Sequence, residues 1–274
     1  MNAPQLSIII PAYNSAKTIE ETLHSVIEQD AENIECMVID GSSTDGTVAI
    51  LEKYSIQFPF IKYISETDKG IYDAMNKGIA LAKGNYLYFM GSDDVFYNNT
   101  VLSDLFAHPY FNTIDFIYAD VLFKYNRFRV GEEKTYLKLI KNQDNICHQA
   151  IFYAKHIFET LGNYNLKYPI YADFNLNVRC FRDDTITKKY LNTIICIFNE
   201  KGTSHFHRSK DTYFIELHEE YVLTNEDPVA MYDTLRKLES RVAELLNSKE
   251  YLLGKKIGDV LRKLKGIGKR HGML

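Results

Sequence analysis

The sequence predicts an α/β protein built on a mixed, mostly parallel sheet that is flanked by helices. Its first hundred residues alternate four strand-length apolar runs with segments of helical periodicity, and this alternation is typical of a doubly wound sheet. Polar residues directly follow several of the apolar runs. In open α/β sheets, ligands bind at the carboxyl ends of the strands, so these polar residues are the first candidates for a site.

The first run, 6–10, is rich in β-branched residues, and we expect this strand to stop at Pro11. Ser15 or Asn14 can cap the helix that follows, which we expect to run to about Gln29. The same periodicity predicts the other elements of this half, namely strands at 36–39, 61–64 and 86–90 and helices at about 47–54 and 70–82.

The second half is less regular. Short apolar runs predict strands at 116–119 and 121–125, in an antiparallel arrangement, and at 150–153 and 191–198. Residues 173–181 suggest a helix and 199–208 a polar loop. From about Pro228 the chain becomes amphipathic and helical. We therefore expect a sheet domain over 1–227 and a C-terminal helical extension over 228–274.

Composition narrows the class of protein. The chain has 274 residues, 46% of them hydrophobic, and a net charge of −4, which fits a soluble globular protein and does not suggest a nucleic-acid binder. Four widely spaced cysteines without a CxxC pair indicate reduced thiols. Because no apolar run approaches the ~20 residues that span a bilayer, and no signal-peptide pattern opens the chain, we expect a cytoplasmic protein.

The C-terminal extension carries two patterns of its own. Apolar residues with 3-4-3 spacing predict a helix over 230–248 that either docks on its own domain or forms a homodimer contact. Residues 249–274 hold eight basic residues and two acidic ones, a charge of +6. Such a basic amphipathic stretch is either a solvated tail or a segment that holds the protein on the anionic inner face of the plasma membrane.

Two adjacent carboxylates, Asp93 and Asp94, carry the strongest chemical signal. They follow Gly91 and Ser92 at the end of the run 86–90. Neighbouring carboxylates repel each other, and they are tolerated when they are solvated or when a hard divalent cation lies between them and a phosphate-bearing ligand. An acidic turn after a strand is the simpler alternative for this pattern alone.

Four motifs occur in register: LSIIIPAYN at 6–14, VIDGSSTDGT at 38–47, DKG at 68–70 and GSDD at 91–94. Together they resemble the family-two glycosyltransferases, which are inverting enzymes with the GT-A fold. The resemblance implies a nucleotide-diphosphate sugar as donor, most simply a UDP-sugar, and Mn²⁺ or Mg²⁺ as cofactor. The stretch 68–84 is most similar to transferases that build bacterial surface polysaccharides, which implies a lipid-linked or saccharide acceptor.

The resemblance also implies roles for individual residues. The segment after the first strand would hold uracil and ribose, with the ring of Tyr13 stacked on the base. Asp94 would bind the metal directly, whereas Asp93 would reach the ribose or a metal-bound water. The motif departs from a literal D-x-D, which leaves the division between the two acids open. The implied donor-binding residues are Pro11, Ala12, Tyr13, Asn14, Asp40, Lys69 and Asp93.

An inverting transfer needs one general base, and Asp173 matches its position in the family. The alternative for Asp173 is a helix N-cap before Phe174. His148 and Gln149 resemble a segment that lines the acceptor side, although a core histidine fits equally. His205 or His207 is an alternative for completing the metal shell, but only one ring of a His-x-His pair on a strand can face a given site.

Processive members of this family carry a Gln-x-x-Arg-Trp motif and membrane helices, and this chain contains no tryptophan. The sequence therefore predicts an enzyme that adds one sugar and releases the product. Two other classes compete with this interpretation. A nucleotidyltransferase would carry a glycine-rich phosphate loop where Pro-Ala-Tyr-Asn stands, and a non-catalytic sugar-nucleotide-binding subunit would not need its acids.

Overall fold

The computed structural model describes residues 3–142, 144–201, 211–217 and 236–240. The chain divides into two compact units, 1–206 and 207–274, and the described residues of the second are 211–217 and 236–240. The expected helix 230–248 lies outside the described residues except for 236–240, and the basic stretch 249–274 lies wholly outside them. The domain boundary at 227/228 stays a prediction.

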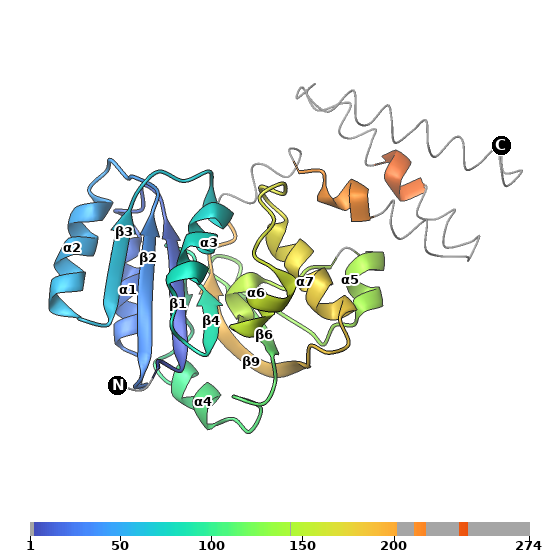
Figure 1. Cartoon of the computed structure of the whole chain (residues 1–274), viewed down its shortest axis with the longest axis horizontal. Coiled ribbons are helices and arrows are strands. Elements are labelled where there is room, and N and C mark those ends of the chain that lie inside the picture. Colours follow the sequence, from blue (N-terminus) through green and yellow to red (C-terminus); the bar gives the residue numbers. More distant parts are fainter. Residues whose placement is uncertain (1–2, 143, 202–210, 218–235, 241–274) are drawn as a thin grey trace, which may run out of the picture. The chain divides into compact units, whose positions relative to one another are not determined.

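The first half of the chain forms the parallel part of the sheet (Figure 1). The strands β1 (Leu6–Ala12), β2 (Ile34–Asp40), β3 (Ile61–Ser65) and β4 (Tyr86–Phe89) lie in the order β3-β2-β1-β4 and all pair in parallel. The connecting helices are α1 (Ile19–Ile27), α2 (Thr47–Gln57) and α3 (Ile71–Leu81). Each of these elements was expected from the sequence, within a few residues at its ends.

Two details of the first strand and helix differ from expectation. Pro11 does not end β1, which continues to Ala12 beside β2. The carbonyl of Ile9 accepts the N–H of Met90, so the main chain of Ile9 faces β4. Pro11, two residues later, also has its nitrogen on the β4 side, but β4 has already ended there. The missing N–H of Pro11 therefore breaks no hydrogen bond between strands. Helix α1 has Thr18 as its N-cap rather than Asn14 or Ser15, because the chain first makes a tight turn after Ser15.

The second half completes a mixed sheet of nine strands in the described residues. The strand β8 (Ile151–Ala154) is antiparallel to β4 and to β6 (Phe116–Phe123), whereas β9 (Lys188–Phe198) runs parallel to β6. Short strands β5 (Val95–Phe96) and β7 (Arg129–Val130) pair with β9 and β6. The expectation of two strands at 116–119 and 121–125 is wrong. Asp120 interrupts the apolar pattern, but Arg129 and Tyr190 bind its buried carboxylate, so one strand continues through it.

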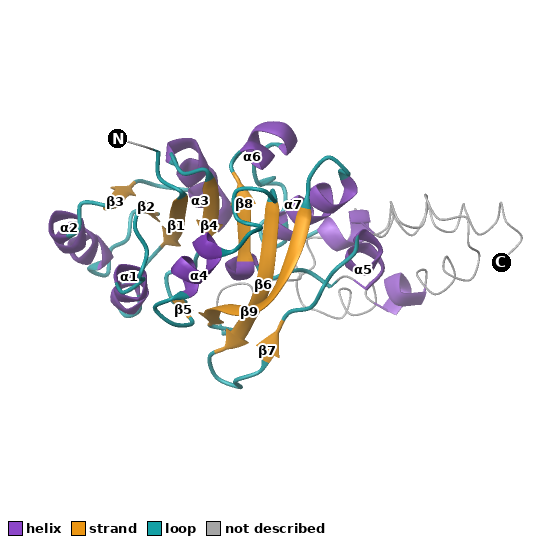
Figure 2. Cartoon of the chain, turned by 90° about the horizontal axis from the view of Figure 1, so that it is seen from below, coloured by secondary structure: helices purple, strands orange, loops and turns teal. Residues whose placement is uncertain are grey.

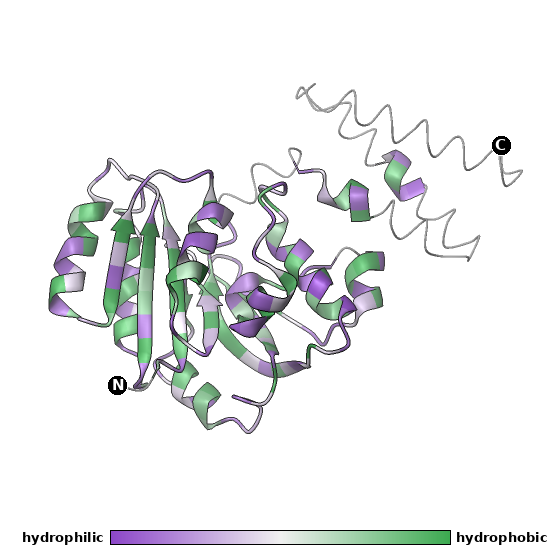
Figure 3. Ribbon diagram, viewed as in Figure 1, coloured by the Kyte–Doolittle hydropathy of each residue, from purple (hydrophilic) through white to green (hydrophobic). Residues whose placement is uncertain are grey.

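Helices cover both faces of this sheet (Figure 2). Apolar residues of α1, α2 and α4 (Val101–Ala107) share one core cluster with the strands. Helices α3, α6 (His156–Leu161) and α7 (Ala172–Arg182) lie on the opposite face, and α5 (Tyr136–Asn142) packs against α7. Figure 3 shows hydrophobic and hydrophilic residues mixed along α2, which buries Thr47, Leu51 and Tyr54. In the described residues, no helix combines the length and the apolar character needed to cross a membrane.

Candidate active site

The two predicted acids lie just beyond the end of β4, where amide groups from distant segments bind them. Asp94 is buried, and its Oδ2 accepts a hydrogen bond from Gln149 Nε2 at 2.8 Å. Its Oδ1 accepts the main-chain N–H of Asn199 at 2.7 Å, and the side chain of Asn199 donates to Asp93 Oδ2 at 2.7 Å. Asn199 therefore holds both carboxylates in one orientation. Ser92 joins this turn to the end of β1 through a 2.7 Å bond with Ser15.

The geometry explains why the motif contains Gly91 and why the pKa values of both acids are raised. A Cβ atom at Gly91 would lie 2.5 Å from Asp94 Oδ2 and 3.1 Å from Asp93 Oδ1, so any side chain there would collide with the acids. Burial raises the pKa of Asp94 to about 6, and the neighbouring charge of Asp93 adds to this effect. Burial also raises the pKa of Asp93. The protein thus holds two carboxylates where their charge is unfavourable, and a cation would relieve this cost.

These residues fit a divalent cation that is shared with a ligand. Each Asp94 oxygen accepts one hydrogen bond and keeps a lone pair, and carboxylate oxygens are the donors that Mg²⁺ and Mn²⁺ prefer. Over the ranges that the structure describes, no three His, Cys, Asp or Glu side chains gather as a complete metal shell. A diphosphate and water would have to supply the remaining ligands. His205 and His207 lie outside the described residues.

The predicted base, Asp173, is a nearly buried carboxylate in the first turn of α7. The N-cap of this helix is Tyr171, so the alternative of an N-cap role for Asp173 is wrong. Its Oδ1 accepts the hydroxyl of Tyr72 at 3.0 Å and the N–H of Phe174 at 2.7 Å. The Oδ2 atom accepts Asn145 Nδ2 at 3.1 Å and lies 3.4 Å from His148 Nδ1. The longer bonds leave Oδ2 as the more available of the two oxygens.

A single turn of 3-10 helix, η1 (His148–Ala150), connects the two acidic centres. His148 contacts Asp173, and the next residue, Gln149, contacts Asp94. With Nδ1 as donor to Asp173, the Nε2 atom of His148 is a buried acceptor without a hydrogen-bond partner. The histidine is thus part of the site and not a core residue whose polar atoms are all satisfied.

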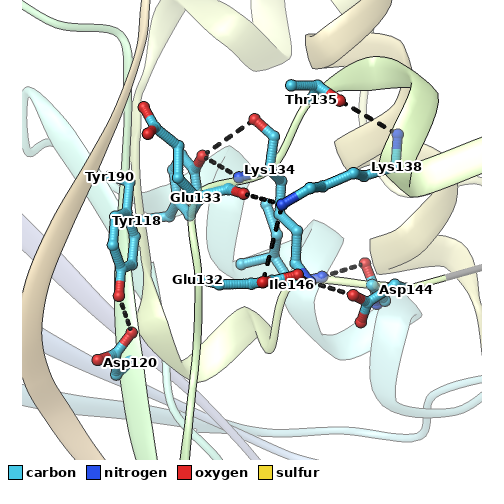
Figure 4. A network of polar contacts seen from close by, with 11 residues as sticks. Tyr118, Asp120, Glu132, Glu133, Lys134, Thr135, Lys138, Asp144, Ile146 and Tyr190 are labelled. Carbon is cyan, nitrogen blue, oxygen red and sulfur yellow. Dashed lines mark hydrogen bonds and ion pairs between the residues drawn. The ribbon is translucent and has the colours of Figure 1, made fainter. Parts of the chain in front are cut away.

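The segment that leads into η1 is fastened by ion pairs (Figure 4). Lys134 Nζ binds Glu132 at 3.0 Å and also binds Asp144, although the side chain of Lys134 is only 6% exposed. The hydroxyl of Tyr118, on β6, accepts the main-chain N–H of Lys134 at 2.9 Å. Because Asn145 follows Asp144 directly, these contacts fix the residue that donates to Asp173.

The expected nucleotide-binding residues gather at the carboxyl ends of β1 and β2. Tyr13 is 66% exposed, which leaves it open to a stacking partner. A Cβ atom at Gly41 would lie 3.3 Å from the Tyr13 ring and 2.6 Å from Asp68 Oδ2, so Asp68 also belongs to this region. Asp40 is fully buried. Its carboxylate accepts bonds from Ser65 Oγ at 2.6 Å and from Ser43, so it organises the loop beside Tyr13.

Four further predicted residues lie at the end of β1 or just before α3. Pro11 and Ala12 are buried at the end of β1. Asn14 has φ +50°, a conformation that asparagine tolerates, and its Oδ1 accepts the N–H of Thr44 at 2.9 Å. Lys69 is exposed at the start of α3. The strand ends thus bring the separate motifs 11–14, 40–44 and 68–70 together.

Sequence reasoning assigned no role to several residues that hold the acids. Tyr72 lies inside the quoted motif 68–84 and could have been singled out there. Asn145 and Asn199 had no signal, because a lone asparagine in a loop is usually a turn residue. Gln149 was placed on the acceptor side, whereas the structure puts its amide on Asp94.

Comparison with known proteins settles the family. Residues 7–161, more than half of the chain, match Glycosyl transferase family 2. The chain belongs to this family. A curated relative, the PGL/p-HBAD biosynthesis glycosyltransferase of Mycobacterium bovis, is 37% identical over 204 residues, which cover 74% of this chain and 79% of the relative. The family-two assignment drawn from the four motifs is thereby confirmed.

Solved glycosyltransferase structures share the fold. S. aureus TarS 1–349 in complex with UDP-GlcNAc superposes with a TM-score of 0.68 at 19% identity, covering 95% of this chain and 80% of that one. The mannosyltransferase PcManGT from Pyrobaculum calidifontis, in complex with GDP-Man and Mn²⁺, gives a TM-score of 0.59 at 17% identity, with coverages of 97% and 87%. The GT-A fold expected for this family-two chain is confirmed.

Proposed function

We propose that this glycosyltransferase is non-processive and inverting. It moves one sugar from a nucleotide-diphosphate sugar, most simply a UDP-sugar, to a lipid-linked or saccharide acceptor in cell-surface polysaccharide biosynthesis. The observation that carries the proposal is η1, whose consecutive residues His148 and Gln149 contact Asp173 and Asp94. These contacts support one site in which Asp94 would hold a metal–diphosphate and Asp173 would accept a proton.

In the proposed reaction, an acceptor hydroxyl attacks the anomeric carbon from the face opposite the diphosphate. Asp173 takes the hydroxyl proton on Oδ2 while Tyr72 and the N–H of Phe174 hold Oδ1. The bond between the anomeric carbon and the diphosphate oxygen breaks, and its electron pair leaves with the diphosphate. Configuration inverts because entry and departure use opposite faces.

Asp94, with Asp93 beside it, would hold Mn²⁺ or Mg²⁺. When bound, this cation neutralises charge on the departing diphosphate. Tyr13 would stack on the base, and Asp40, Asn14 and Lys69 would lie along the nucleotide. The donors bound in the similar structures, UDP-GlcNAc in TarS and GDP-Man in PcManGT, support a nucleotide sugar as the donor.

A lipid-linked acceptor implies work at a membrane. We propose that the enzyme is cytoplasmic and peripheral on the inner face of the plasma membrane, with residues 249–274 as one contact, since that stretch carries a charge of +6. Removal of 249–274 is then expected to release the protein from anionic vesicles in a flotation assay, and unchanged binding would count against this role.

The decisive test is hydrolysis and transfer with a panel of UDP- and GDP-sugars in the presence of Mn²⁺. Asp94→Ala is expected to abolish turnover together with Mn²⁺-dependent UDP binding. Asp173→Asn is expected to keep UDP binding and lose transfer by about 10²- to 10⁴-fold. Asp184→Asn, which alters an exposed carboxylate just beyond the same helix, serves as the matched control.

The outcomes separate the proposal from its competitors. Full transfer activity in Asp173→Asn would remove Asp173 as the base. If no donor is turned over and UDP with Mn²⁺ gives no thermal stabilisation, the non-catalytic binding subunit becomes the better interpretation.

A further inference from the structure

The tip of the β6–β7 hairpin, residues 124–130, exposes large apolar side chains. Phe128 is 69% exposed, Tyr125 54% and Val130 41%. Single exposed apolar residues are common on soluble proteins, but three within six residues of one turn form a local patch. Such a patch on a protein surface indicates an interaction site when the backbone beneath it is well ordered.

Hydrogen bonds hold the backbone of this tip in a defined turn. Arg127 N–H donates to Phe123 O at 3.1 Å, and Phe123 N–H donates to Phe128 O at 2.9 Å, which closes the turn. The N–H of Phe128 also donates to Asn126 Oδ1 at 2.9 Å. Since the main-chain groups have partners, the exposure of the rings is a property of the folded hairpin.

The apolar tip is rich in basic side chains, and the carboxylate of Glu200 also binds its main chain. The segment 124–131 contains Lys124, Arg127 and Arg129 and no acidic residue, and Lys201 Nζ lies 3.7 Å from the centre of the Tyr125 ring. Lys124 pairs with Glu21, and Arg129 pairs with Asp120. In the described part of the chain, Arg127 and Lys201 have no acidic partner. Aromatic rings flanked by unpaired cations are typical of a surface that binds the interface of an anionic bilayer.

The tip is also connected to the catalytic acids. The carboxylate of Glu200 accepts the N–H groups of Tyr125 and Asn126, at 3.2 Å to Oε1 in both cases. The preceding residue, Asn199, binds Asp93 and Asp94. Adjacent residues therefore make the contact with the hairpin and the contact with the acids, so a surface bound at the tip lies close to the site.

We propose that the hairpin 124–130 inserts Phe128 and Tyr125 into the interface of an anionic lipid bilayer, with Arg127 and Lys201 at the headgroups. This inference rests on the proposed function, because a lipid-linked acceptor lies in that bilayer. It goes beyond the role given to 249–274, since the contact belongs to the catalytic unit and orients its active site toward the membrane.

The absence of tryptophan from the chain provides a direct test. Phe128→Trp in the full chain places a single fluorophore at the proposed insertion point. Its emission is expected to shift to the blue, and to be quenched by brominated lipids, with vesicles of phosphatidylglycerol and phosphatidylcholine but not with phosphatidylcholine alone. The matched control is Ile56→Trp on α2, a position that is 78% exposed, whose emission stays unchanged.

Charge gives a second, quantitative readout. Arg127→Gln is expected to weaken vesicle binding about fivefold, since one basic residue near an anionic surface contributes roughly that factor. Flotation of the full chain measures it. An Arg127→Gln variant that binds as tightly as the parent would contradict the headgroup contact.

Three results would overturn the inference. The first is that the full chain does not bind anionic vesicles. The second is that the Phe128→Trp variant binds while its emission stays that of exposed indole, which assigns all binding to other residues. The third is that the emission of this variant is blue-shifted without lipid and depends on protein concentration, which identifies a contact between copies. None of these outcomes affects donor hydrolysis. Loss of hydrolysis and UDP binding in the parent would instead contradict the proposed function.

Discussion

Replacing Asp94 by Asn is expected to stabilise the metal-free protein at neutral pH. Burial raises the pKa of Asp94 from its ordinary value of 3.8 to about 6. Between these two values the folded state binds more protons than the unfolded state, so stability falls as pH rises through this window. The loss amounts to about 3 kcal/mol, which is the shift multiplied by about 1.36 kcal/mol per pH unit. Asparagine carries no charge and avoids this loss.

The substitution also has a cost that the structure defines. Both oxygens of Asp94 accept hydrogen bonds, one from Gln149 and one from Asn199, whereas an asparagine side chain offers a single acceptor. Losing one such bond costs about 1 kcal/mol. The net gain above pH 6 is therefore about 2 kcal/mol, and below pH 3.8 the sign reverses, because Asp94 is then neutral in both states.

Urea unfolding in the presence of a chelator measures this difference. The Asp94→Asn variant is expected to be more stable than the parent at pH 7.5 and slightly less stable at pH 3.5. Addition of UDP and Mn²⁺ at pH 7.5 is expected to stabilise only the parent, since the cation binds the ionised carboxylate. If the variant is less stable than the parent at both pH values, with Asp184→Asn unchanged, the carboxylate is not destabilised by burial and the reasoning fails.

Two other substitutions test how the acids are held. Tyr72→Phe removes the hydrogen bond that holds Asp173 Oδ1, so transfer is expected to fall by roughly tenfold without a change in UDP affinity. Tyr164→Phe, in the ring packed against Tyr72, is the control. Asn199→Ala removes the side-chain donor to Asp93 and is expected to weaken Mn²⁺-dependent UDP binding by about 10- to 100-fold in calorimetry, whereas unchanged binding would remove Asn199 from the metal site.

The first half of the fold was predictable because each of its elements has a local signature. A parallel strand buried on both faces is a continuous apolar run, and a helix between two such strands has its own period, so neither needs information from distant residues. The position of the expected donor-side residues at the strand ends follows from the same pattern, whereas their roles come from the family resemblance and stay predictions.

The second half depends on contacts that leave no local pattern. A polar residue within β6, Asp120, is satisfied by Arg129 and Tyr190, and without that knowledge the run appears as two strands. The donors to Asp94 come from Gln149 and Asn199, which are 55 and 105 residues away along the chain. Neither the side-chain amide of Gln149 nor the main-chain N–H of Asn199 gives any indication of such a partner, because the topology of the sheet decides the pairing.

The link through 199–201 joins two properties that the sequence presents as unrelated, a pair of acids and an aromatic, basic hairpin. Asn199 cannot shift without changing its bonds to Asp93 and Asp94, and Glu200 cannot shift without changing its bonds to the hairpin. If the hairpin binds a bilayer, occupancy of the donor site and membrane binding share this segment. By thermodynamic reciprocity, any factor by which vesicles change the affinity for Mn²⁺–UDP must equal the factor by which Mn²⁺–UDP changes the affinity for vesicles. A shared factor different from one, measured independently in both directions, would show that the segment couples the two sites. Factors of one in both directions would show that it is a rigid support.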